Sequence, residues 1–276
     1  MKIGFLTNAL RKRSLEEIAK WATKNDFEFL EVGPHVPADK SMFKKVIEDT
    51  GIHIIGLIFC RNFQEKNERK RRELREELKR RVELVCDMGF EFITISTGVD
   101  KDKSFDDNVK LFKEFITPIL EKCEDHGVRI AIENCPDTGN IATSPHRWEV
   151  IFKEIDSKYL GLCYDPSHLV RLFIDPYRPV RRFADKIFYV HAKDTEIDSV
   201  KLSWLGIIEK RGWWRYRLPG LGLIDWNRFL LALREAGFNG YISIEHEDPL
   251  WSTTEEKVKE GLILARNYLR KLPAFQ

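Results

Sequence analysis

The chain has 276 residues, of which 43% are hydrophobic and 33% charged, so it can bury a substantial core in one large domain or two small ones. The 46 Lys and Arg against 44 Asp and Glu leave a formal charge of +2, which excludes an overall basic field for binding nucleic acid. No apolar run approaches the ~18–20 residues of a membrane span, so we expect no membrane partner either.

The cysteines and the N-terminus bear on the location of the protein. The five cysteines form no CxxC pair and several lie in apolar runs, as reduced, buried thiols of a cytosolic protein do. The chain enters the strand-like Lys2–Thr7 almost at once, which leaves no room for a signal peptide. We therefore expect a soluble, cytoplasmic protein. Its few Met and Gln and its many Lys, Glu and Arg indicate a thermophilic source.

Strand-like apolar runs alternate with amphipathic helical stretches from one end of the chain to the other. Strands are predicted over Lys2–Thr7, Phe27–Val32, Ile52–Phe59, Phe90–Ser96, Val128–Glu133, Leu160–Asp165, Ile187–His191 and Tyr241–Glu245. Helices are predicted over Ser14–Lys24, Asp39–Thr50, Asn67–Met88, Phe105–His126, Pro145–Ile155, Asp175–Ala184, Asp225–Ala236 and Thr253–Leu272. Glycine repeatedly stands between a helix and the next strand, where its tolerance of a left-handed conformation ends the helix.

Eight strand–helix units of about 34 residues each have the size expected of a (β/α)8 TIM barrel. We therefore predict an α/β protein with one such domain over residues 1–276. An open, doubly wound sheet is the alternative, and it would carry a glycine-rich phosphate loop after the first strand. The segment in that place, Thr7–Ser14, contains no glycine. No linker indicates a second domain.

Four residues with acidic or imidazole side chains each end a predicted strand: Glu133, Asp165, His191 and Glu245. A charged group at the end of a buried strand costs free energy unless something there needs it. In a TIM barrel the C-terminal ends of the strands meet at the mouth, where active sites lie. Any one of the four alone could be a helix cap or a surface charge, and Asp165 begins a turn-like Asp-Pro-Ser-His sequence. Together, three carboxylates and one imidazole predict a site for a divalent cation.

Three further residues are candidates for contacts with a substrate. Glu31 ends the second predicted strand and should face the same cavity. His168 follows Asp165 by three residues, as a substrate contact or as a structural histidine. Lys193 shares a strand face with His191, and either binds a substrate oxygen or pairs with the adjacent Asp194.

The segment between the strands of His191 and Glu245 is too long for one unit, and the surplus lies in Thr195–Gly220. This insertion carries three tryptophans, a tyrosine and Arg217, and it should lie over the mouth of the barrel. It can serve as a lid, as a wall of the substrate pocket or as a subunit interface in a homo-oligomer.

Several motifs, taken in order, resemble those of the xylose isomerase-like TIM barrel superfamily, in its sugar phosphate isomerase/epimerase family. They are Ile130–Pro136, Tyr164–Leu169, Val190–Asp194, Leu218–Trp226 and Gly240–Pro249. The resemblance implies a metal-dependent enzyme. In the similar ketose 3-epimerases, the positions of the four strand-end residues hold a divalent metal. The positions of Glu133 and Glu245 also act as acid and base on opposite sides of the substrate, and that of His168 contacts it.

Two departures from the ketose 3-epimerase pattern bear on the substrate. Those enzymes carry a further Glu shortly after the first ligand Glu, and Cys135–Pro145 contains none. They also place an Arg soon after the ligand His, where this chain has Ile197 and no Arg nearby, although Arg217 could replace it. The resemblance therefore implies a substrate among keto-sugars, glycosides or cyclitols in place of a free ketohexose. The residues expected to bind it are His168, Lys193, Glu31 and Arg217.

The function expected from these residues is a divalent-metal-dependent isomerase or epimerase acting on a sugar or sugar derivative. Glu133 or Glu245 would remove a proton next to a carbonyl, through a metal-stabilised enediolate, and the other would return it. Oxygen-rich ligation favours Mn²⁺, with Co²⁺, Mg²⁺ or Zn²⁺ as alternatives. The rival functions are a lyase on the same barrel, similar to inosose dehydratases or glycoside-eliminating enzymes, an abasic-site endonuclease, and a non-catalytic sugar-binding protein.

Overall fold

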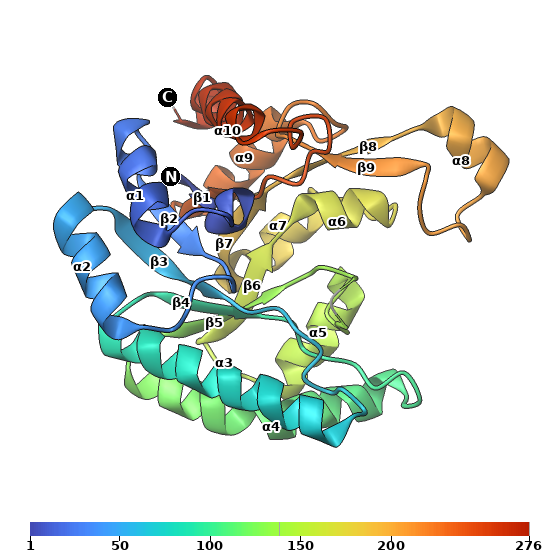
Figure 1. The fold of residues 1–276 in the computed structure, drawn as a ribbon. Coiled ribbons are helices and arrows are strands. Elements are labelled where there is room, and N and C mark those ends of the chain that lie inside the picture. Colours follow the sequence, from blue (N-terminus) through green and yellow to red (C-terminus); the bar gives the residue numbers. More distant parts are fainter. Residues whose placement is uncertain (138, 276) are drawn as a thin grey trace.

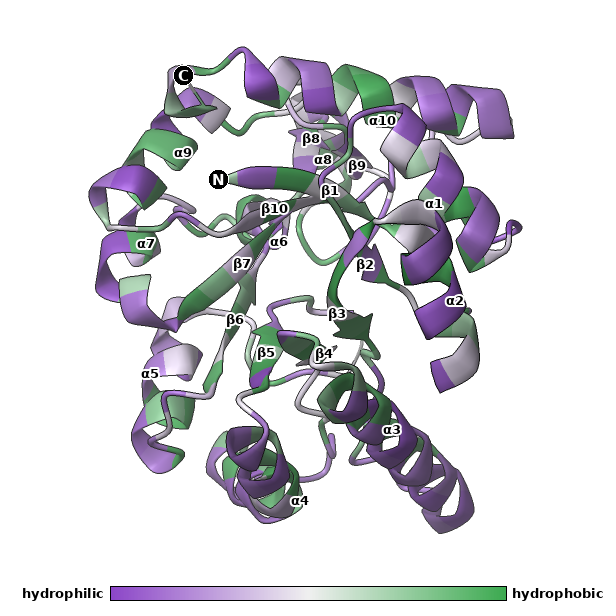
Figure 2. Ribbon diagram, turned by 90° about the vertical axis from the view of Figure 1, so that its left-hand side faces the viewer, coloured by the Kyte–Doolittle hydropathy of each residue, from purple (hydrophilic) through white to green (hydrophobic). Residues whose placement is uncertain are grey.

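The computed structural model describes residues 1–137 and 139–275. Eight parallel strands close into a barrel in the order β1-β10-β7-β6-β5-β4-β3-β2, so the predicted (β/α)8 fold is confirmed (Figure 2). The barrel strands are β1 (Lys2–Leu6), β2 (Phe29–Val32), β3 (His53–Ile58), β4 (Phe92–Ile95), β5 (Arg129–Glu133), β6 (Leu160–Tyr164), β7 (Ile187–Ala192) and β10 (Tyr241–Ile244). Each predicted strand overlaps one of them.

Helices surround the barrel, each following a strand (Figure 1). The helices that follow the predicted pattern are α1 (Leu15–Lys24), α2 (Lys40–Thr50), α3 (Glu68–Met88), α4 (Phe105–Asp125), α5 (Pro145–Glu154), α9 (Trp226–Glu235) and α10 (Glu255–Arg270). Ser14 and Glu17 form a capping box at the start of α1, and Gly89 ends α3 with a φ of 66°. None of the helices in the described parts of the chain is both long and apolar enough to cross a membrane.

The apolar side chains form two layers, one between the strands and the helices and one inside the barrel. The inner layer consists of Phe29, Ile55, Phe92, Ala131, Cys163, Phe188 and Tyr189. In a TIM barrel the interior is a packed core and not a pore. This layer therefore forms a closed floor beneath the polar side chains that gather at the C-terminal ends of the strands.

The segment after β6 differs from the prediction. The predicted helix Asp175–Ala184 is reduced to α7 (Arg178–Arg182), and an additional helix, α6 (Pro166–Arg171), begins directly after the strand. Asp165 caps α6 by accepting a hydrogen bond from the Ser167 main-chain N–H. Proline at the first helical position and an Asp cap are both typical of a helix start, so the sequence contained the signal for α6.

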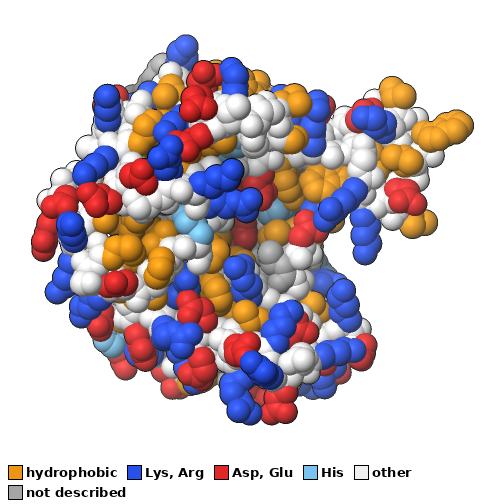
Figure 3. Space-filling model, viewed as in Figure 1, with side chains coloured by type: hydrophobic (Ala, Val, Ile, Leu, Met, Phe, Trp, Pro, Cys, Tyr) orange, Lys and Arg blue, Asp and Glu red, His pale blue; other side chains and the backbone are white. Residues whose placement is uncertain are grey.

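The insertion forms an arm that leaves the barrel (Figure 1). The antiparallel strands β8 (Asp194–Ile197) and β9 (Trp214–Arg217) form its base, and α8 (Ser199–Leu205) lies at its far end. Figure 3 shows exposed hydrophobic side chains at the far end of the arm, among charged ones. Trp204, in α8, is 91% exposed. The base of the arm reaches the mouth of the barrel, where the Tyr216 hydroxyl contacts His168, whereas α8 lies away from the barrel (Figure 1).

Candidate metal centre

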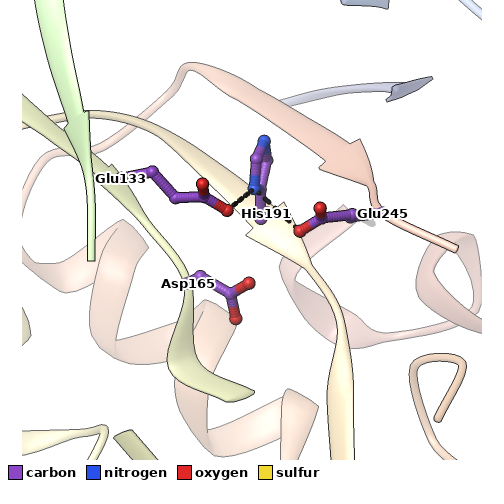
Figure 4. Close-up of side chains that lie close together, drawn as sticks. All are labelled: Glu133, Asp165, His191 and Glu245. Carbon is purple, nitrogen blue, oxygen red and sulfur yellow. Dashed lines mark hydrogen bonds and ion pairs between the residues drawn. The ribbon is translucent and has the colours of Figure 1, made fainter. Parts of the chain in front are cut away.

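The four strand-end residues converge at the mouth of the barrel (Figure 4). Each of Glu133, Asp165, His191 and Glu245 offers one ligand atom, and these atoms all lie within 4.8 Å of one another. All four residues are buried. The arrangement is possible because β5, β6, β7 and β10 are hydrogen-bonded neighbours in the barrel, so their C-terminal ends lie side by side.

His191 is oriented with one nitrogen toward the centre and the other away from it. Its Nδ1 atom lies 3.2 Å from Glu133 Oε1 and 3.1 Å from Glu245 Oε2, and the two carboxylates approach it from opposite sides (Figure 4). Its Nε2 atom lies 2.9 Å from Glu31 Oε2. A proton donated by Nε2 to Glu31 leaves the Nδ1 lone pair facing the centre, which is the tautomer that a metal ligand needs.

Asp165 divides its two oxygens between the helix and the centre. Oδ1 accepts the hydrogen bond from Ser167 N at 2.8 Å, which caps α6. Oδ2 is fully buried and accepts no hydrogen bond from the residues that the structure describes, although Lys193 Nζ lies 3.2 Å from it as an ion-pair partner. The helix-cap and metal-ligand interpretations of Asp165 are therefore compatible. A buried carboxylate oxygen that accepts no hydrogen bond is costly, and a cation bound at this point would satisfy it.

The charges around the centre also favour a bound cation. Five carboxylates gather within or next to it, opposed by one ammonium group: Glu31, Glu133, Asp165, Glu245, Glu247 and Lys193. The Lys193 Nζ atom lies 2.6 Å from Glu245, 3.0 Å from Glu247 and 3.2 Å from Asp165. Four of these carboxylates are buried, and one lysine cannot balance their charge, so the residues present fit a divalent cation.

Both glutamates of the centre are ionised at neutral pH. Burial raises the pKa of Glu133, but hydrogen bonds from His168 and His191 outweigh it and hold that pKa well below its usual range. Burial likewise raises the pKa of Glu245, but the charges of Lys193 and His191 lower it to about 2. An ionised carboxylate is the form that binds a metal or accepts a proton.

The buried thiols beside the centre are in the inert form. Burial raises the pKa of Cys163 to about 12, and burial together with the charge of Glu133 raises that of Cys60 well above its usual value. A thiol that stays protonated is a poor nucleophile and a poor metal ligand.

Glu31 lies behind His191, within the barrel. Its Oε1 accepts a hydrogen bond from the Tyr189 hydroxyl at 2.6 Å, and its Oε2 accepts one from the Ser243 hydroxyl at 2.7 Å. Both oxygens also lie within 3.1 Å of His191 Nε2. These contacts favour a positioning role for Glu31 over the predicted contact with the substrate. The sequence analysis missed Tyr189 and did not connect Ser243 with Glu31.

Glu31→Gln should weaken the binding of a divalent cation by about tenfold to a hundredfold, because the amide nitrogen cannot accept the hydrogen bonds that orient His191. Calorimetric titration with Mn²⁺ would measure the change. Glu91→Gln is the matched control, because Glu91 accepts hydrogen bonds from His53 and Tyr241 at the opposite end of the barrel. Equal cation affinities in wild type and Glu31→Gln would contradict the positioning role.

His168 lies next to the centre, as its sequence position indicated. Its Nε2 atom is 3.4 Å from Asp165 Oδ2, and its Nδ1 atom is 2.8 Å from the Tyr216 hydroxyl. Tyr216 is held in turn by Arg171, whose NH1 lies 3.0 Å from the same hydroxyl. The base of the arm thus supplies an aromatic wall beside the centre. Substrate binding by His168 stays a prediction.

Two roles were predicted for Lys193, and the structure decides against an ion pair with the adjacent Asp194. Its ammonium group faces the carboxylates of the centre and does not pair with Asp194. The Asp194 carboxylate instead accepts hydrogen bonds from the main-chain N–H groups of Thr195, Gly220 and Ile224 and from the Trp226 indole, and so fastens the arm to the barrel.

Arg217 is not brought into the centre. Its guanidinium group binds Glu196 on the neighbouring strand of the arm and lies 2.8 Å from Asp248. These two carboxylates occupy it with structural contacts, and its predicted role in binding the substrate stays a prediction.

A cavity of about 250 Å³ lies above the centre. Its lining includes Glu133, Glu245, His168, Lys193 and Tyr216. The cavity thus gives a small molecule access to both glutamates and to the edge of the arm. At about 250 Å³ it is slightly smaller than a typical ligand pocket, and its polar side chains can orient a small bound molecule.

Two curated relatives are similar to almost the whole chain. The inosose isomerase of Bacillus velezensis is 24% identical over 273 residues, which cover 94% of this chain and 94% of that protein. The inosose dehydratase of Clostridium beijerinckii is 23% identical over 282 residues, covering 96% of this chain and 92% of the relative.

A solved structure has the same fold. The crystal structure of IOLI protein with a binding zinc atom has a TM-score of 0.73 and 20% identity, and the match covers 98% of this chain and 99% of that one. The profile of the family described as xylose isomerase-like TIM barrel matches residues 19–268. Together with the closed barrel, this match shows that the chain belongs to the xylose isomerase-like TIM barrel family.

Proposed function

We propose that this protein is a divalent-metal-dependent isomerase or epimerase of a sugar or sugar derivative. The observation that carries the proposal is the convergence of two ionised glutamates, an aspartate and a correctly oriented histidine on one buried point at the mouth of the barrel. A divalent cation held there would polarise a substrate carbonyl and acidify the neighbouring C–H group.

Glu133 and Glu245 have the positions required for proton transfer. Their carboxylates approach His191 from opposite sides, so a substrate above the centre would have one on each side (Figure 4). One glutamate removes the proton next to the carbonyl, and the other delivers a proton to the opposite face or to the adjacent carbon. Their low pKa values keep both in the basic form, so either can accept the first proton, and the glutamate that delivers a proton must first take one up from solvent in the cavity.

Lys193 and His168 complete the reacting end of the cavity. The Lys193 ammonium lies over the Tyr216 ring, 4.5 Å from its centroid, and can donate to an oxygen of a bound sugar. Burial lowers the pKa of His168, but the charge of Asp165 outweighs it and raises the pKa well above its usual value, so the imidazole can donate a hydrogen bond. Both groups would stabilise negative charge on the substrate oxygens.

The relatives support this class of chemistry and leave two reactions to be compared. The names inosose isomerase and inosose dehydratase both point to keto-cyclitols, and both reactions can begin with loss of a proton next to a carbonyl. We propose Mn²⁺ as the cation because three of the four ligands are carboxylates. Zinc is the competing choice, in view of the IOLI structure.

The test is a product assay in deuterated water with Mn²⁺ present. Inososes and keto-sugars should yield an isomer or epimer that has gained solvent deuterium at the reacting carbon, because the proton taken by a glutamate exchanges before it is returned. Loss of water from the product would instead assign the protein to the dehydratase reaction. No deuterium uptake by any of these substrates, with the cation bound, would contradict proton abstraction altogether.

A further inference from the structure

A second and larger cavity, of about 750 Å³, adjoins the one above the metal centre. It lies between the loops that follow β1, β2, β3 and β10 and the start of α10. Five residues line both cavities: Asn8, Pro34, Arg61, Glu245 and Glu247. A molecule whose reacting carbon lies at the centre would therefore extend into this second space.

Three cations and three carboxylates line the second cavity, and in the described chain none of these cations pairs with one of these carboxylates. Arg11, Lys12 and Arg61 line it, and within residues 1–137 and 139–275 none of them has a carboxylate partner within 4.0 Å. Figure 3 shows basic side chains beside the hollow at this end of the molecule. Most of the basic residues on the helices form salt bridges within the chain. These three cations form none with the described carboxylates, so they are available to pair with an anion bound in the cavity.

The carboxylates that line the same cavity pair with cations other than Arg11, Lys12 and Arg61. Glu245 and Glu247 both bind the Lys193 ammonium, at 2.6 and 3.0 Å. Glu255 is paired with Arg13 at 2.9 Å and with Lys259 at 2.6 Å, both outside the cavity lining. The cations of the cavity are thus not paired with its own acidic residues.

Arg61 is the best placed of the three cations, because it lies where the two cavities meet. Its guanidinium group stacks over the Phe59 ring at 5.0 Å, and its NH1 donates to the Cys60 carbonyl at 2.7 Å. The Ser96 hydroxyl binds its main-chain oxygen at 2.7 Å. An anchored guanidinium whose other N–H groups have no partner in the described chain suits the paired oxygens of a phosphate or carboxylate.

The histidine at the edge of this cavity adds no competing charge. Burial, followed by the charge of Arg11, lowers the pKa of His35, so its ring is neutral at pH 7. Its Nδ1 atom lies 3.2 Å from Asn8 Oδ1, and its buried Nε2 has no partner among the described residues.

We propose that the second cavity binds the anionic group of the substrate, so that the substrate is a sugar derivative carrying a phosphate monoester or a carboxylate. The carbonyl end of this molecule lies at the metal centre and the anionic end meets Arg61, Arg11 and Lys12. This inference rests on the proposed function, since it extends the same site to the far end of the substrate.

The experiment compares the binding of four probes to the Mn²⁺-loaded protein by calorimetry. The probes are D-fructose, D-fructose 6-phosphate, 5-keto-D-gluconate and inorganic phosphate. The phosphate ester or the keto-acid should bind at least about tenfold more tightly than neutral fructose, and added salt should reduce the difference. Whichever of the two binds more tightly identifies the anionic group.

The variants locate the anion. Arg61→Ala should lower the affinity for the anionic probe by about tenfold or more, as expected for loss of a charge-assisted hydrogen bond. The double variant Arg11→Ala/Lys12→Ala gives a second test at the other cations. Arg181→Ala is the control, because Arg181 is an exposed cation on α7 and lines neither cavity. Thermal melting of each variant would confirm that the fold is intact.

Two results would overturn the proposal and leave the metal-dependent function standing. One is equal affinity for neutral and anionic probes in a protein that binds Mn²⁺. The other is a preference for the anion that survives in both the Arg61 variant and the double variant, which would place the anion elsewhere. Failure to bind Mn²⁺ at all would instead contradict the proposed function itself.

Discussion

Glu245→Gln should reduce the turnover of the proposed reaction by about a thousandfold or more at saturating Mn²⁺. Glutamine cannot accept a proton, and loss of a general base or acid typically costs 10²–10⁴-fold in rate. Saturation with the cation separates this loss from weaker metal binding, because Glu245 is also one of the four ligand residues. The measurement is kcat in the product assay, with cation occupancy checked by calorimetry.

Glu247→Gln is the matched control for this variant. Glu247 lies two residues further along the chain and also contacts Lys193, but its side chain is 47% exposed and contributes no ligand atom to the centre. We expect a loss of turnover at least tenfold smaller than in Glu245→Gln. Near-wild-type turnover in Glu245→Gln, with the cation bound, would exclude Glu245 as the acid or base.

The barrel could be predicted because its signals are local and repeated. Each strand is a short apolar run, and glycines such as Gly51 and Gly89 end helices through positive φ angles of 66°. The segment after β6 could be predicted less accurately. There the cap at Asp165 starts a short helix, and the amphipathic pattern further along the chain indicated a longer one than the structure contains.

The four residues of the centre could be found because a TIM barrel brings strand ends together, so position along each strand predicts position in space. The contacts that orient these four residues could not be predicted from the sequence. The Tyr189 hydroxyl that binds Glu31 lies 158 residues from it in the chain, and no local pattern connects the two. The sequence also could not show which carboxylate pairs with Lys193. The adjacent Asp194 points away from it and accepts hydrogen bonds that fasten the arm.

The second cavity depends on loops that have no recognisable motif. Arg11, His35 and Arg61 follow three different strands, and each looks like an ordinary surface residue in the sequence. Only the closed barrel places them together, next to the centre. The charge of the whole chain, +2, also gives no indication that these cations meet in one cavity. Sequence analysis can therefore identify the reacting end of such a site more readily than the end that selects the substrate.

Removing divalent cations with a chelator should abolish activity and lower the melting temperature, and Mn²⁺ should restore both. Without a cation, the buried carboxylates of Glu133, Asp165 and Glu245 repel one another, so binding stabilises the folded state. At a concentration a hundredfold above Kd, the added stability is about 2.7 kcal/mol. Differential scanning calorimetry with and without Mn²⁺ measures this shift directly.

The increase in melting temperature that Mn²⁺ produces should also become larger as the pH rises. Although burial opposes protonation, the charges of Glu31 and Glu245 are among the causes that raise the pKa of His191 well above its usual value, so the cation must displace a proton from this ring. Cation affinity therefore rises as the pH increases toward that raised pKa, with proton release detectable in buffers of different ionisation enthalpy. His191→Gln should abolish proton release, whereas His53→Gln, at the opposite end of the barrel, should retain it. A melting temperature unchanged by Mn²⁺ across this pH range would show that the four residues do not hold a cation.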